Sequence, residues 1–231
     1  MIPDPSHLSP GDLAAMAEAG EQLAALEQGM RAVGTSPRAL LLGDQTGFEP
    51  YRHYPPGDVY DFASHAQYYV HDHRDGEYGH AHLFLRPLGM PPGCAPLVAV
   101  GGADSPCHLI AVGFGHHGFA AELFTTNRWV TGESWYDAAT VARMLPCFQV
   151  DGPGAGGRVG RWLTALLKLY RPLVVALVRQ RDQMVAAWRA GHDGDPLNDD
   201  RLEVTSHAAI DVGLWRQGVA AALRARAHLV P

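Results

Sequence analysis

Apolar residues near the N-terminus recur at intervals of three, four or seven positions, which is the spacing that places them on one face of an α-helix. These positions are Leu13, Met16, Leu23, Leu26 and Met30. Ser9 followed by Pro10 is a typical helix start, and Gly34 followed by Pro37 ends the pattern. The sequence therefore predicts an N-terminal helix within residues 1–34.

The middle of the chain, residues 35–132, changes to short apolar runs separated by glycine and proline, which predicts a β-rich core. Residues 97–100 are predicted to form a buried strand. Residues 108–114 and 119–124 are predicted to form a hairpin, because a glycine-flanked loop joins two apolar runs. Residues 50–57 hold three prolines and are predicted to form a loop.

Residues 133–231 are predicted to be mainly helical, with one late strand. A short helix is expected to begin after Ser134, and a longer one with a broad apolar stripe over about residues 158–189. Pro172 should kink the longer helix, because it removes a backbone donor and crowds the preceding turn. Apolar and polar residues then alternate over 202–212, which indicates a strand with one buried face, and a final short helix follows.

Together these patterns predict one α+β domain over residues 1–231. Its centre is an antiparallel sheet of β-hairpins from about residue 65 to residue 130, joined by the late strand. The N-terminal and C-terminal helices are expected to pack on this sheet. A chain of 231 residues is long enough to bury a sizeable core.

Composition and charge exclude several function classes. The formal net charge is −6 and the basic residues are spread along the chain, so no basic stripe predicts a nucleic-acid partner. No apolar run approaches the length of a membrane span and the N-terminus lacks a signal-peptide pattern, so no membrane partner is expected. The cysteines are odd in number and lack C-x-x-C spacing, which favours a reducing, cytoplasmic location.

Candidate chemistry is concentrated in two His-x-His pairs that flank an Asp75-Gly76 dipeptide. Asp-Gly between strand-like segments is typical of a tight hairpin turn, because both central positions need positive φ. Such a turn pairs Arg74 with Glu77, His73 with Tyr78, His71 with His80 and Tyr69 with His82. Since alternate side chains share a face, one face carries Tyr69, His71, His73, Tyr78, His80 and His82, and the other carries Val70, Ala81, Leu83 and Leu85.

The crowding of imidazoles on one face predicts a metal site. The chain contains 13 histidines and a single lysine. Opposed Cβ atoms lie roughly 5 Å apart and an imidazole binds a metal at about 2.0–2.1 Å, so three of the four rings could reach one ion. The predicted ligands of this transition-metal ion are His71, His73, His80 and His82. Neutral imidazole suits Fe, Zn, Cu and Ni alike, so the identity of the metal stays open.

The predicted site indicates a metal-dependent enzyme, an oxidoreductase or a hydrolase, whose small-molecule substrate is polar or acidic. Tyr69 and Tyr78 are candidate proton donors, and the guanidinium of Arg128 could anchor an acidic group. Oxygen chemistry is preferred over hydrolysis, because the adjacent tyrosines and a carboxylate, Asp61 or Glu77, would suit an oxygen-activating iron site.

Two other interpretations of the same histidines stay open. The protein could bind a metal, haem or another small ligand without turnover, which a closed four-histidine site would favour. It could also hold no metal, with a histidine face that is solvated, or that packs on a partner subunit in a homo-oligomer and responds to pH. Whether Glu77, Asp61 or His65 completes the ligand set is a further open point.

The spacing His71-x-His73-x-x-x-Glu77 resembles the first motif of the cupin barrels, in which two histidines, a glutamate and a later histidine bind a metal. The glycines that flank that motif are missing here, and no second cupin motif follows. The chain as a whole resembles an uncharacterised bacterial family with no known activity. That resemblance is carried by Tyr78-Gly-His-Ala-His-Leu-Phe-Leu-Arg86 and Leu123-Phe-Thr-Thr-Asn-Arg-Trp-Val-Thr131.

Overall fold

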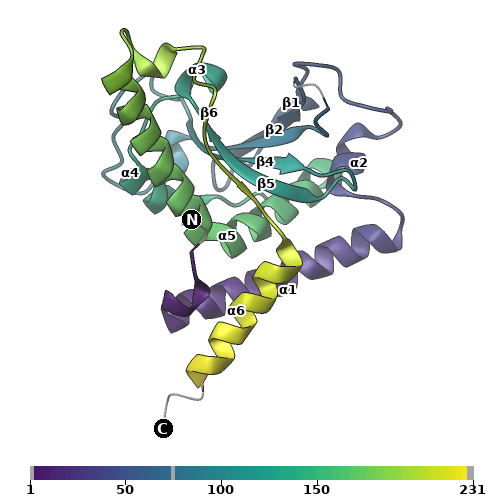
Figure 1. The fold of residues 1–231 in the computed structure, drawn as a ribbon. Helices are drawn as coiled ribbons and strands as arrows, with labels where there is room; N and C mark the ends of the chain where they lie inside the picture. The colour runs from purple at the N-terminus through teal and green to yellow at the C-terminus, as the bar shows by residue number, and fades with distance from the viewer. Residues whose placement is uncertain (1–2, 74–75, 228–231) are drawn as a thin grey trace.

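The computed structural model describes residues 3–73 and 76–227 of the chain. Six strands form one antiparallel sheet, in which the spatial order follows the chain order from β1 to β6 (Figure 1). The strands are β1 (Tyr54–Tyr60), β2 (Ala66–His71), β3 (His80–Leu85), β4 (Cys107–Phe114), β5 (Ala120–Thr126) and β6 (Val204–Ala209). The predicted α+β class with a central antiparallel sheet is confirmed, and the late strand joins that sheet as its last member.

The helices lie before, between and after the strands. The α-helices are α1 (Pro10–Ala32), α2 (Pro37–Leu42), α3 (Arg128–Thr131), α4 (Ala138–Met144), α5 (Gly154–Gly191) and α6 (Val212–Ala227), and the 3₁₀ turns are η1 (Pro5–His7), η2 (Pro87–Gly89), η3 (Leu145–Cys147) and η4 (Pro196–Asn198). The Ser9 side chain caps α1 as the sequence predicts. Asp137, rather than Ser134, caps α4. The helix α5 continues through Pro172.

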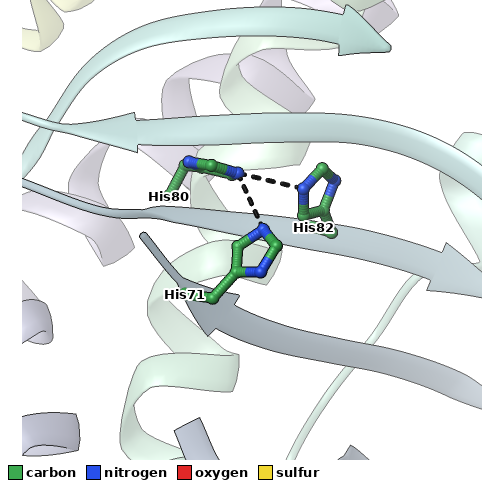
Figure 2. Close-up of side chains that lie close together, drawn as sticks. All are labelled: His71, His80 and His82. Carbon is green, nitrogen blue, oxygen red and sulfur yellow. Dashed lines mark hydrogen bonds between the residues drawn. The ribbon is translucent and has the colours of Figure 1, made fainter. Parts of the chain in front are cut away.

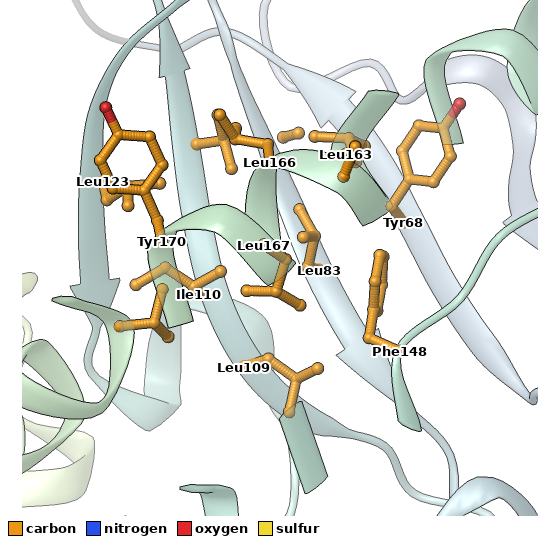
Figure 3. Close-up of a cluster of buried hydrophobic side chains, with 14 of the residues drawn as sticks. Tyr68, Leu83, Leu109, Ile110, Leu123, Phe148, Leu163, Leu166, Leu167 and Tyr170 are labelled. Atoms are coloured by element: carbon orange, nitrogen blue, oxygen red, sulfur yellow. The ribbon is translucent and has the colours of Figure 1, made fainter. Parts of the chain in front are cut away.

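The main core lies between the sheet and α5. Leu83 on β3, Ile110 on β4 and Leu123 on β5 face Leu163 and Leu166 on α5, and all five are buried (Figure 3). The helix α5 also contacts α1, and α1 in turn contacts α6. Figure 1 shows α1 and α6 beneath the sheet. The apolar stripe predicted for residues 158–189 is therefore the surface that α5 buries. Among the described residues, none of the helices combines the length and apolar composition needed to cross a bilayer.

Two strand predictions were wrong. The proline-rich segment predicted as a loop contains β1, because β1 is an edge strand in which Pro55 and Pro56 fall at an irregularity of the pairing with β2. Residues 97–100, predicted as a buried strand, make only an isolated bridge between Val98 and Trp135. Leu97 is largely exposed, so this apolar run has no sheet neighbour to bury it.

The histidine hairpin, β2–β3, has the predicted register over its whole ladder. His71 pairs with His80 and Tyr69 pairs with His82, as expected. The ladder ends there, so the predicted pair of His73 with Tyr78 was wrong: both residues lie in the connection between the strands. The predicted turn and the Arg74–Glu77 pair involve residues 74 and 75, which lie outside the described residues.

Candidate metal centre

Three histidine side chains converge beside the β2–β3 hairpin: His71 at the end of β2, and His80 and His82 at the start of β3. The Nε2 atom of His80 lies 3.0 Å from Nε2 of His71 and 3.1 Å from Nε2 of His82. All three nitrogens lie within 4.8 Å of one another. Figure 2 shows the three rings directed at the same space, with a dashed line from one His80 nitrogen to each of the other two rings. We call these residues the three-histidine cluster.

The three-histidine cluster is buried. His71, His80 and His82 are only 8%, 1% and 0% exposed. Aromatic rings surround them: Phe124 on β5 lies 5.3 Å from His80, and Tyr69 on β2 lies 5.3 Å from both His71 and His82. The interpretation of these residues as a solvated polar face was therefore wrong, because both faces of the sheet are covered at this point.

The outer nitrogens of two cluster residues also have partners. Nδ1 of His80 lies 3.0 Å from Oε2 of Glu77, and Nδ1 of His82 lies 3.1 Å from Nε2 of His108. A carboxylate accepts hydrogen bonds only, so the contact with Glu77 places the proton of a neutral His80 on Nδ1 and a lone pair on Nε2. This lone pair points into the space that the three rings share.

Burial keeps His71, His82 and the adjacent His108 neutral. Burial, followed by the nearby His80 and His73, lowers the pKa of His71 to about 3. Burial and then the neighbouring His108 lower the pKa of His82 well below its usual value. Burial likewise lowers the pKa of His108 to about 3. At neutral pH these imidazoles therefore keep a lone pair, which is the form that binds a metal ion.

His73, the fourth predicted ligand, has its ring centroid 5.0 Å from that of His71 and 5.2 Å from that of His80. Together with Glu77 and His80 it forms a second group, whose ligand atoms all lie within 4.8 Å of one another. In the hairpin register predicted from the sequence, side-chain alternation turns Glu77 away from the histidines, and this orientation was wrong. Gly79 has a φ of +86°, which interrupts the strand alternation, and Glu77 turns back so that Oε2 reaches His80 and Oε1 accepts from the His73 backbone N–H.

The remaining predicted residues are dispersed. Tyr69 lies beside the three-histidine cluster, whereas Tyr78 is 44% exposed and its ring contacts His116 on the β4–β5 turn. Arg128 lies on α3 and donates to Asn198. Two residues proposed to complete the ligand set have other partners: Asp61 accepts from the backbone of residues 63, 64 and 151, and Nδ1 of His65 contacts the Tyr60 hydroxyl.

Two residues near the cluster could not be found by strand alternation or motif. Strand alternation predicts that His108 lies on the core face together with Ile110. In the structure, Leu109 is an extra residue that shifts the pairing of β3 with β4. His108 therefore lies opposite Phe84 and next to His82. Glu133 lies in the segment after α3 and is 2% exposed. Burial raises its pKa to about 8, and its charge contributes to the raised pKa of Tyr69.

The fold and the site define an α+β protein with a buried histidine cluster on a β-hairpin. The chain belongs to the family described as a domain of unknown function (DUF6969), whose model matches residues 17–210. That range contains every residue of the candidate site, and the predicted membership in an uncharacterised family is confirmed. No curated protein and no solved structure matches the chain.

Proposed function

We propose that the protein is a metal-dependent enzyme whose transition-metal ion is bound by Nε2 of His71, His80 and His82. The observation that carries this proposal is the convergence of three buried ring nitrogens at separations of 3.0 and 3.1 Å. Two nitrogens bound to one ion at about 2.0–2.1 Å lie about 2.9–3.4 Å apart when the angle between the bonds is about 90–110°. An ion therefore fits the cluster with little movement of the rings.

The hydrogen bonds around the cluster support the same assignment. Histidines that bind a metal usually donate their other N–H to a carboxylate or a similar acceptor, which fixes the ring and its tautomer. Glu77 is such an acceptor for His80, and His108 is placed to be one for His82. In that arrangement the Nε2 lone pairs of His80 and His82 face each other, and a cation between them replaces repulsion with attraction.

Catalysis is favoured over storage because three protein ligands leave at least one coordination position open. Iron in such a site supplies oxygen chemistry, and zinc supplies a water nucleophile at neutral pH. We favour oxygen chemistry, because the aromatic rings of Phe84 and Phe124 keep water away and suit a small apolar molecule such as dioxygen. Burial raises the pKa of Tyr69, so its hydroxyl keeps its proton and can donate to a substrate.

The polar or acidic co-substrate has one further candidate anchor. The Nε atom of Arg128 is buried and has no hydrogen-bond partner among the described residues. A buried guanidinium nitrogen without a partner is costly, and an acidic group would satisfy it. The three free cysteines, Cys94, Cys107 and Cys147, favour a reducing, cytoplasmic location for this enzyme.

A second candidate function is metal binding without turnover. Its supporting observation is the burial of the cluster, since a ligand exposed by 8% or less gives a substrate little access. The two functions differ in the open coordination position. If the protein is loaded with cobalt(II), azide should change the visible spectrum when such a position exists and should leave it unchanged in a closed site.

The test of metal binding is elemental analysis of protein purified without an affinity tag. We expect one or more transition-metal ions per chain, and one ion fewer in His71→Ala and His82→Ala, because each change removes one of the three ligands of the ion in the three-histidine cluster. The control is His116→Ala/His117→Ala, which removes two histidines from the β4–β5 turn and should retain the metal. Circular dichroism and thermal unfolding verify that each variant is folded. Native protein that binds no Fe, Zn, Cu or Ni, even after incubation with each ion, would overturn the proposal.

A further inference from the structure

His80 presents both of its ring nitrogens to potential metal ligands. Nε2 faces His71 and His82 in the three-histidine cluster, and Nδ1 faces Oε2 of Glu77 at 3.0 Å. His73, Glu77 and His80 form a second group whose ligand atoms lie within 4.8 Å of one another, and Nδ1 is the His80 nitrogen that contacts Glu77 in it. We call this second group the outer site. One imidazole thus lies between two sets of ligands.

A carboxylate oxygen that neighbours the outer site in sequence is buried. Asp72 lies between the ligands His71 and His73 in sequence, and its Oδ1 atom is buried with no hydrogen-bond partner among the described residues. A buried carboxylate oxygen without a donor is costly, and a cation nearby would offset this cost.

The donor types also match a metal ion. Imidazole together with carboxylate is a ligand set common to zinc, iron and copper sites. Glu77 keeps one oxygen on the His73 backbone N–H at 2.7 Å, which holds the carboxylate in position while the other oxygen faces Nδ1 of His80. The outer site is also more accessible than the cluster, since the Glu77 side chain is 16% exposed and that of His80 is 1% exposed.

We propose that His80 bridges two divalent transition-metal ions as an imidazolate, with an inner ion on His71, His80 Nε2 and His82, and an outer ion on His73, Glu77 and His80 Nδ1. The inner ion is that of the proposed function, and the outer ion is an addition to it. The outer ion replaces the proton that Nδ1 donates to Glu77, and this proton is released to solvent. Each outer ion bound therefore releases one proton from His80.

The proposed ligands offset part of the charge of the two ions. Two divalent ions bring four positive charges, and the Glu77 carboxylate and the imidazolate offset two of them. A neutral imidazole has only one lone pair and can bind one ion. Deprotonation of His80 is therefore required for both ions to be present, and the inner ion favours it by withdrawing charge from the ring.

The experiment is a titration of the metal-free full chain with copper(II), followed by electron paramagnetic resonance. The first equivalent should give the signal of one unpaired electron per chain. The second equivalent should remove that signal at low temperature, because two copper(II) ions joined by an imidazolate pair their spins. In weakly buffered solution the second equivalent should also release one proton per chain.

Two variants and one control locate the second ion. His73→Ala and Glu77→Gln should each bind one equivalent and keep the one-electron signal, whereas His116→Ala/His117→Ala should behave as the native protein. His73→Ala is the cleaner variant, because Glu77 also orients His80 toward the inner ion. Thermal unfolding of the metal-free variants verifies their fold.

The outcomes separate this inference from the proposed function. Native protein that binds one equivalent and no more overturns the bridge and leaves the inner centre standing. Two equivalents with two independent signals overturn the bridge as well, because the ions are then not joined through His80. If His73→Ala still binds two equivalents with paired spins, the outer site is placed wrongly. Native protein that binds no copper overturns both.

Discussion

Glu133 should make the stability of this protein depend on pH. Its side chain is 2% exposed, and the Thr131 hydroxyl donates to Oε2. Burial raises its pKa to about 8, although the charges of Arg181 and Arg128 act in the opposite direction. With this pKa, Glu133 is protonated at neutral pH in the folded protein, whereas it is ionised in the unfolded chain.

The sign and magnitude follow from this difference. Between pH 4.5, the usual pKa of a glutamate, and the pKa of about 8 in the folded protein, the folded state binds one proton more than the unfolded state. The contribution of Glu133 to the free energy of unfolding therefore falls by about 1.4 kcal/mol for each pH unit in this range, and by up to about 5 kcal/mol over the whole range. The contribution is fully present below pH 4.5 and is lost as the pH rises through 8.

Glu133→Gln isolates this effect, because glutamine has nearly the same shape and does not titrate. The buried histidines act in the opposite direction at lower pH, so the quantity to measure is the difference between variant and native protein. Urea unfolding of metal-free protein should give nearly equal stabilities at pH 5, with the variant becoming more stable by a few kcal/mol by pH 8. Glu18→Gln, on the exposed surface of α1, is the matched control and should give a constant difference. A constant difference for Glu133→Gln would refute the reasoning, because the two arginines would then hold Glu133 ionised.

Two other changes test the site and the core separately. His108→Ala removes the partner of His82 Nδ1 and should weaken metal affinity about 10–100-fold. The affinity is measured by competition with a chelator. An unchanged affinity would mean that His108 does not position His82. Leu166 is buried on α5, so Leu166→Ala should lower the free energy of unfolding by about 2–5 kcal/mol and leave the metal content per chain unchanged. A loss of metal in this variant would show that the core and the three-histidine cluster are coupled.

The sequence was most informative where strand alternation is regular. The pairing of His71 with His80 could be predicted because a β-ladder has a fixed period of two, so that one correct pair sets every other pair of the ladder. The helices α1 and α5 could be predicted because their apolar faces repeat over several turns. The predicted register therefore placed His71, His80 and His82, three of the four predicted ligands, side by side as the structure does.

The errors within the histidine cluster lie where that period is broken. A one-residue bulge at Leu109 moves His108 to the histidine face, and the positive φ of Gly79 lets Glu77 turn toward His80. Neither feature has a signal in a single sequence, because each depends on contacts with a neighbouring strand or loop. Glu133 could not be found either, since its environment is made by segments distant in sequence, including Arg181 on α5.

The hydrogen bonds of the three-histidine cluster give an independent reason to expect a cation there. Nε2 of His80 faces two other nitrogens at 3.0 and 3.1 Å, but an imidazole nitrogen carries either one proton or one lone pair and makes one good hydrogen bond. Without an ion, one of these two buried contacts is therefore unsatisfied, whichever tautomers the rings adopt. Such a deficit destabilises the fold, and apolar residues on β3 would avoid it. A metal ion removes the deficit by accepting all three lone pairs at once, which is why we favour a metal centre over a metal-free histidine face.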